Sequence, residues 1–151
     1  MIHPSAIIAK NAEIHETTHI GPFCIIGDGV KIGENNNLIS HVSIVGDTTI
    51  ENSNTFYPFC SIGSEPQDLK YNKEKSYLKI GSNNKFRENV TVNPGTSGGG
   101  LNTIISNNCF SLKSGEIFSS NGFSLLFFSL SLHNFLTKAV RGFFSCKSLK
   151  L

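Results

Sequence analysis

One short polar segment, "PQDLKY" at residues 66–71, places three side chains capable of polar contacts close together in the sequence. Gln67 can both donate and accept hydrogen bonds, Asp68 is an acceptor, and Lys70 carries a positive charge. The surrounding run is rich in Lys and Glu, and on composition alone a solvated surface loop is the ordinary interpretation. The function of this segment therefore depends on the scaffold that holds it.

A second candidate for chemistry is the glycine triplet Gly98 to Gly100, since glycines can cradle a phosphate. A phosphate-binding loop follows a strand, opens a helix and has a Lys and a Ser or Thr at a fixed offset. The phrase "GGGLNTIIS" instead re-enters the pattern of the surrounding chain. We expect a tight turn here rather than a phosphate site.

That pattern is a period of six residues. A large apolar residue occupies every sixth position, at Ile2, Ile8, Ile14, Ile20, Ile26, Ile32, Leu38, Ile44, Ile50, Phe56 and Ile62. A small or slender residue comes four positions after each, and Gly, Asn, Asp and Glu fill much of the remainder. The period resumes at Ile80, Phe86 and Val92 and again at about Ile104, so residues 65–79 form a loop inserted into a continuing repeat.

Hexapeptide repeats are typical of parallel β-helices. Three hexads close one triangular coil of eighteen residues, and coils stack at about the 4.8 Å spacing between strands. Isoleucine suits the interior because its side chain is stiff and packs well on a pleated surface. Glycine and asparagine suit the corners because they accept positive φ. The sequence predicts an all-β fold of this kind, with a loop held out from it.

The eighteen-residue period also predicts where the cysteines and histidines lie relative to one another. Cys24 and Cys60 lie two coils apart on one face, about 9 to 10 Å from each other, so we expect buried thiols rather than a disulfide. No CxxC pair is present, and no two of His3, His15, His19 and His41 are spaced to stack on one face. His133 is a lone histidine among apolar residues. We expect no metal and no cofactor.

Composition bounds the remaining possibilities. The chain of 151 residues is 38% hydrophobic and 16% charged, with a net charge of +2 and scattered Lys and Arg, which does not favour nucleic acid as a partner. The start lacks the basic and apolar regions of a secretory signal, so we expect a cytoplasmic protein. Polar residues interrupt the uncharged run from Ile117 to Thr137, so no integral membrane span is expected.

Residues 1–109 resemble the UDP-N-acetylglucosamine acyltransferases of lipid A biosynthesis, which belong to the hexapeptide-repeat acyltransferases. The resemblance rests on "SIGSEPQDLKY" and on "IGSNNKFRENVTVNPGTSGGG", with its arginine-glutamate hexad and glycine triplet. It implies a left-handed parallel β-helix that assembles as a homotrimer. It further implies transfer of a 3-hydroxyacyl chain from acyl carrier protein to the glucosamine 3-hydroxyl of UDP-N-acetylglucosamine. Gln67, Asp68 and Lys70 are the residues it implies for binding the nucleotide sugar.

The resemblance ends near Cys109. The family's general base is a histidine in the coil after the glycine triplet, and here Phe118 stands about where that base is expected. General-base catalysis contributes about 10² to 10⁴ in rate, so we expect little or no acyl transfer and assign no catalytic residue. Eight of the twelve phenylalanines lie at or beyond Phe110. We expect a truncated β-helix over 1–109 and a divergent, irregular or partly helical tail over 110–151, for which a frameshift is one explanation.

Two other functions stay open. The chain is alternatively a non-catalytic β-helix that binds a UDP-sugar or assembles with full-length subunits. It is otherwise an active enzyme of a sister type, such as a later acyltransferase of the pathway or a sugar acetyltransferase, although the QDLKY phrase argues against this.

Overall fold

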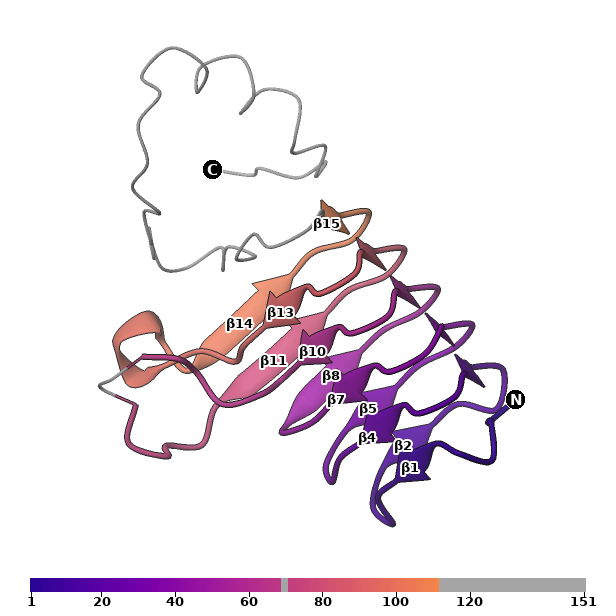
Figure 1. The fold of residues 1–151 in the computed structure, drawn as a ribbon. Coiled ribbons are helices and arrows are strands. Elements are labelled where there is room, and N and C mark those ends of the chain that lie inside the picture. Colours follow the sequence, from indigo (N-terminus) through magenta and orange to yellow (C-terminus); the bar gives the residue numbers. More distant parts are fainter. Residues whose placement is uncertain (69–70, 112–151) are drawn as a thin grey trace, which may run out of the picture.

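The chain winds into a three-sided parallel β-helix in which each side is a sheet of very short strands (Figure 1). The structure, a computed structural model, describes residues 1–68 and 71–111. Sheet 1 runs in the order β1 (Ile7–Ile8), β4 (Ile25–Ile26), β7 (Ser43–Ile44), β10 (Ser61–Ile62) and β13 (Thr91–Val92). Sheet 2 contains β2 (Glu13–Ile14), β5 (Lys31–Ile32), β8 (Thr48–Ile50), β11 (Tyr77–Ile80) and β14 (Asn102–Ile105). Sheet 3 contains β3 (His19–Ile20), β6 (Asn37–Leu38), β9 (Thr55–Phe56), β12 (Lys85–Phe86) and β15 (Phe110–Ser111).

The register confirms the coil of eighteen residues. Ile8 pairs with Ile26, and Ile26 in turn pairs with Ile44. Every neighbouring pair of strands among the described residues is parallel, because each coil lays its strand against the equivalent strand of the coil before. The predicted all-β architecture with an inserted loop is therefore present.

The core is the column of every-sixth residues. Twelve of these hexad residues have 4% or less of their surface exposed, namely Ile20, Ile26, Ile32, Leu38, Ile44, Ile50, Phe56, Ile62, Ile80, Phe86, Val92 and Ile105. The rings of Phe56 and Phe86 stack in parallel with their centroids 4.8 Å apart. Ile2 is in register but 52% exposed, since a residue of the first coil has a neighbouring coil on one side only. Burial of this column is the main stabilising term of the fold.

A column of buried polar side chains lies at the corner between sheets 2 and 3. The backbone N–H of Asn54 donates to Asn36 Oδ1 at 2.9 Å, and the N–H of Asn84 donates to Asn54 Oδ1 at 2.9 Å. The same geometry begins at Thr18 and continues to the N–H of Cys109. Slender residues are needed here, as the hexads indicate, and asparagine also accepts the backbone hydrogen bond of the next coil.

The cysteine prediction is confirmed for the two residues it concerned. Cys24 and Cys60 are free thiols with at most 1% exposure, and they occupy one column with Val42 between them. Burial raises the pKa of the Cys60 thiol to about 11, so it is neutral at physiological pH. Cys146 lies outside the described residues.

Two details differ from the sequence prediction. The buried residue of β14 is Ile105, which pairs with Ile80, whereas Ile104 is 42% exposed; a one-residue shift moves a strand residue to the opposite face. Gly21 does not have the positive φ expected of a corner glycine. Glycine is needed there for another reason: a side chain would collide with the backbone carbonyl of Ile39 in the next coil. Gly63, in contrast, has a φ of +78° and does need glycine.

Two boundaries also lie close to the predicted ones. β11 begins at Tyr77, so the last three residues expected in the loop are strand. β15 continues the β-helix to Ser111, and residues 112–151, which include Phe118, His133 and most of the predicted tail, lie outside the described residues. Among the residues that the structure describes, no helix has the length and apolar character needed to cross a bilayer.

Candidate functional site

Two excursions leave the β-helix at the same corner, between sheets 1 and 2, in successive coils. Ile50 pairs with Ile80, thirty residues on rather than eighteen, so twelve extra residues are inserted between β10 and β11. Ile80 pairs with Ile105, twenty-five residues on, so seven extra residues lie between β13 and β14. We call residues 63–76 the first excursion and residues 93–101 the second excursion. Figure 1 shows them projecting side by side beyond the edge of the triangular coil.

The first excursion contains the residues predicted to bind a nucleotide sugar. Gln67 and Asp68 are both exposed to solvent, and the N–H of Tyr71 donates to the carbonyl of Asp68 at 2.9 Å. Lys70 lies outside the described residues. The structure thus places two of the three predicted residues next to each other on an exposed part of this excursion.

The start of the first excursion is held by Asn93, the first residue of the second. Its side-chain amide Nδ2 donates to the carbonyl of Ser64 at 2.9 Å and to the carbonyl of Glu65 at 2.8 Å. Asn93 directly follows β13, whose Val92 carbonyl accepts from the N–H of Gly63 at 2.7 Å. The side chain is half-buried, so these bonds are partly shielded from water.

The far end of the first excursion is held by the carboxylate of Glu74. One oxygen accepts from the backbone N–H of Ser97 at 3.0 Å, and the other accepts from the N–H of Asn72 at 2.8 Å. Hydrogen bonds from its own N–H, and then from those of Ser97 and Asn72, hold the pKa of the Glu74 carboxyl below its ordinary value. Glu74 therefore joins the two excursions by a charge-assisted contact.

Lys75 joins the first excursion to the β-helix itself. Its Nζ lies 3.8 Å from a carboxylate oxygen of Asp47 and 5.7 Å from the centroid of the Tyr77 ring. Both charged side chains are well exposed, so water screens this pair and its contribution to stability is small.

The glycine triplet forms the tight turn predicted from its context. Ser97–Gly99 make one 3₁₀ turn, η1, which ends at Gly100 with a φ of +82°. The N–H groups of Gly99 and Leu101 both donate to the carbonyl of Thr96 at 2.9 Å. These two hydrogen bonds lie within the turn itself. The N–H of Ser97, in contrast, donates outside the turn, to the carboxylate of Glu74.

The arginine-glutamate hexad lies at another corner. Arg87 donates from Nε and Nη2 to the two carboxylate oxygens of Glu88, at 3.0 and 3.1 Å, and its guanidinium stacks 4.3 Å from the Tyr57 ring centroid. These residues follow β12 and precede β13, so the topology places them between sheets 3 and 1. The structure does not bring this pair to the excursions.

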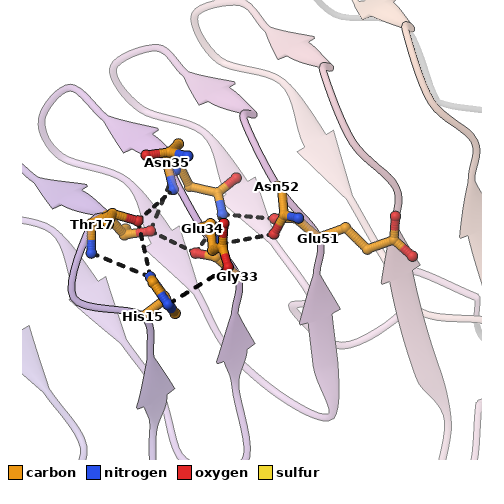
Figure 2. A network of polar contacts seen from close by, with 9 residues as sticks. His15, Thr17, Gly33, Glu34, Asn35, Glu51 and Asn52 are labelled. Atoms are coloured by element: carbon orange, nitrogen blue, oxygen red, sulfur yellow. Dashed lines mark hydrogen bonds and ion pairs between the residues drawn. The ribbon is translucent and has the colours of Figure 1, made fainter.

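Of the four described histidines, His3, His15 and His41 lie at corners, whereas His19 lies in β3, where its Nδ1 is 3.0 Å from Asn37 Oδ1 of the next coil. In Figure 2, His15 contacts Thr17 Oγ1 through Nδ1 at 2.9 Å, and its Nε2 lies 3.8 Å from a Glu34 oxygen. Thr17 also accepts from the N–H of Asn35, and Glu34 donates its N–H to Asn52, so the network ties three coils together.

His41 lies between the rings of Phe23 and Phe59, with centroids about 5 Å away on each side. Within residues 1–68 and 71–111, no three acidic, cysteine or histidine side chains gather as metal ligands.

Asn93 and Glu74 are the functional candidates that sequence reasoning missed. Asn93 stands one position after a hexad residue, where any polar residue fits the repeat, and Glu74 lies among several charged residues of the loop. One signal was available: two interruptions of the repeat, one coil apart, must meet at a single corner. Their contact could have been predicted from that register, although the atoms that make it could not.

Known proteins with similar sequences share one description. The chain is 48% identical over 110 residues to an acyl-[acyl-carrier-protein]–UDP-N-acetylglucosamine O-acyltransferase of a Psychrobacter species, covering 72% of this chain and 42% of that protein. It is 52% identical over 107 residues to the protein of the same name from Rickettsia bellii, covering 71% of this chain and 38% of that one. The chain thus spans about four tenths of the length of the curated relatives it matches. No protein-family model matches it.

Solved structures give the same result. The UDP-N-acetylglucosamine O-acyltransferase of Moraxella catarrhalis superposes with a TM-score of 0.71 at 46% identity, covering 72% of this chain and 42% of that one. The enzyme of Bacteroides fragilis superposes with a TM-score of 0.74 at 42% identity, covering 78% of this chain and 46% of that one. The predicted left-handed parallel β-helix is confirmed by this agreement together with the register of the coils.

Proposed function

Because this chain is a homologue of the UDP-N-acetylglucosamine O-acyltransferases over about 72% of its residues, we propose that its first excursion binds UDP-N-acetylglucosamine. One observation supports this most: the two excursions, one containing the QDLKY phrase and the other the glycine triplet, are joined at one corner by the hydrogen bond from the N–H of Ser97 to the Glu74 carboxylate. Gln67 contacts the sugar and its amide, Asp68 accepts from a hydroxyl, and Lys70 pairs with a phosphate. The acyl donor is a 3-hydroxyacyl chain on acyl carrier protein, and the cytoplasm is where we expect these partners to meet.

The reaction of this family joins the glucosamine 3-hydroxyl oxygen to the acyl carbonyl carbon, and the thiol of the carrier leaves. The hydroxyl must lose its proton as the new bond forms, which is the task of a general base. Phe118 stands about where the family's general-base histidine is expected, and none of the five histidines, His3, His15, His19, His41 and His133, belongs to either excursion. We therefore infer that the 151-residue chain by itself binds the nucleotide sugar but transfers little or no acyl group.

Calorimetry with UDP-N-acetylglucosamine tests the binding site. We expect Lys70→Ala to weaken binding about tenfold or more, since it removes a charge-assisted contact to a phosphate. Lys10→Ala, which removes an exposed lysine of the first coil, is the matched control and should leave the affinity unchanged. Undetectable binding by the unaltered chain would reject the proposal.

Acyl transfer is measured separately with a panel of acyl carrier protein thioesters and nucleotide sugars. We expect no turnover above background with any of them. Robust transfer to UDP-N-acetylglucosamine would overturn the inference of lost catalysis. Transfer to another acceptor alone would favour an enzyme of a sister type.

A second candidate, assembly with further copies as in a homotrimer, is favoured by an exposed apolar surface. Phe23 and Phe59 are 58% and 59% exposed, and Ile7 and Ile25 on the adjoining face of sheet 1 are 66% and 44% exposed. Such a contiguous surface is typical of protein interfaces. Sedimentation velocity of a Phe23→Ser, Phe59→Ser double variant should show a smaller species than the unaltered chain. Ile104→Ser, which changes an exposed residue of sheet 2, is the control; an unchanged distribution for the double variant would reject this interface.

A further inference from the structure

The first excursion is fixed at two points that flank its exposed tip. Before the tip, Asn93 Nδ2 donates to the carbonyls of Ser64 and Glu65 at 2.9 and 2.8 Å. After the tip, the Glu74 carboxylate accepts from the N–H groups of Asn72 and Ser97 at 2.8 and 3.0 Å. Gln67 lies between these points, two residues after the last carbonyl that Asn93 holds.

The geometry between Asn93 and Gln67 leaves little freedom. Asn93 orients the peptide that follows Glu65, and the next residue is Pro66, whose ring fixes φ near −65°. A proline also restricts the residue before it to extended conformations. The orientation set at the Glu65 carbonyl is therefore passed through a stiff residue to the backbone of Gln67.

We propose that Asn93 and Glu74 are positioning residues, which hold the two ends of the first excursion so that Gln67 and Asp68 face a nucleotide sugar in one conformation. The proposal rests on the proposed binding of UDP-N-acetylglucosamine. Neither residue needs to touch the ligand. Their contribution is preorganisation, because a loop that is already ordered loses less conformational entropy when the ligand binds.

Asn93→Asp is the sharpest test, since it changes the donor and keeps the size of the side chain. At neutral pH the introduced carboxylate faces two carbonyl oxygens and can donate to neither, so the start of the loop should loosen. Protonation restores one donor, and the two carbonyls favour the protonated form of the introduced carboxyl. Binding should therefore recover in part as the pH falls from about 7 to about 5.

Titration of Glu74 does not contribute to the expected change in binding between pH 7 and pH 5. Its pKa in the folded chain lies below the ordinary value, so the carboxylate keeps both hydrogen bonds throughout that range and loses them only in stronger acid. The other charged groups of the first excursion are Glu65, Asp68, Lys70, Lys73 and Lys75, and Asp47 of the β-helix lies beside Lys75. The unaltered chain measured at each pH accounts for them. Glu74→Gln is the second variant: its side chain keeps one acceptor, so it should loosen the far end of the loop at neutral pH with no recovery in mild acid.

The experiment combines calorimetry with UDP-N-acetylglucosamine, ¹⁵N order parameters at Gln67 and Asp68, and melting temperatures. Asn102→Asp is the matched control, because Asn102 makes the same kind of amide contact, to the carbonyl of Gly100 at 3.1 Å, without touching the first excursion. Glu16→Gln, at an exposed turn of the first coil, is the control for Glu74→Gln. We expect Asn93→Asp to bind about tenfold more weakly at pH 7, with order parameters falling from about 0.85 toward 0.6. Its melting temperature should stay close to that of the control.

The outcomes separate this proposal from the binding function on which it rests. If the unaltered chain binds and Asn93→Asp binds equally well at pH 7, the positioning role is overturned. Weaker binding by Asn93→Asp without recovery in mild acid would also overturn it, because the lost donor would not be the cause. If the unaltered chain does not bind, the binding function fails; order parameters then decide the positioning role, which is rejected if both residues are as rigid in Asn93→Asp as in the unaltered chain.

Discussion

The regular coils and the two excursions are held together by different kinds of contact. In the coils, a residue meets its own equivalent eighteen positions away, so Ile26 packs on Ile44 and Asn54 bonds to Asn36. In the excursions, each contact occurs once: Asn93 to two carbonyls, Glu74 to two N–H groups, and Lys75 to Asp47. Repetition lets many weak, equivalent contacts accumulate into stability, whereas single contacts fix one conformation of one segment. The coils therefore hold the fold, and the excursions are where a ligand site can be built.

The largest expected effect of a single substitution is in the column of the core. Phe56→Ala removes a ring with no exposed surface that stacks on Phe86 at 4.8 Å, and it leaves a cavity between two coils. We expect the free energy of unfolding to fall by about 3 to 5 kcal/mol in urea denaturation. Lys85→Ala, at the exposed position of β12 that precedes Phe86, should cost less than about 0.5 kcal/mol. Equal losses from the two variants would contradict the assignment of the core.

A smaller effect is expected in the polar column at the corner between sheets 2 and 3. Asn54→Ala removes the oxygen that accepts from the N–H of Asn84, a group that is buried. Leaving that donor without a partner should lower the free energy of unfolding by about 1 to 3 kcal/mol. Asn37→Ala, which removes an outward-facing side chain of β6, should change it by less than about 0.5 kcal/mol. A negligible loss for Asn54→Ala would show that the column is only a packing feature.

The smallest effect is expected in the second excursion and should stay local. Gly100 has a φ of +82°, which costs a residue with a side chain about 1 kcal/mol, whereas Gly98 lacks a positive φ and has open space where a side chain would go. Gly100→Ala should speed hydrogen exchange of the Leu101 amide about fivefold, and Gly98→Ala should not. Neither should change the exchange of amides in the coils. Equal exchange in both variants would remove the distinction between the two glycines.

The architecture could be predicted to the residue in most places because its cause is local and repeated. The apolar position of each hexad, the slender position four residues later and the length of the coil all follow from a period that can be counted. The prediction was wrong by one residue at Ile104, where seven inserted residues conceal the phase of the repeat and only the pairing of Ile80 with Ile105 restores it. The predicted reason for Gly21, a positive φ at a corner, was wrong. Glycine is needed because the backbone of the next coil lies too close for a side chain, and this distance between coils cannot be predicted from the residues of one coil.

The candidate site divides in the same way. Gln67, Asp68 and Lys70 could be named from a motif and its resemblance to a family, and their roles remain predictions. Asn93 and Glu74 could not be named, since their partners lie up to twenty-nine residues away and neither residue type is demanded by the repeat. The sequence by itself determined a β-helix with two interruptions one coil apart, because periodic burial is encoded locally. Only the tertiary structure decided that the interruptions meet through one amide and one carboxylate, because those bonds depend on where coils that are distant along the chain come to lie side by side.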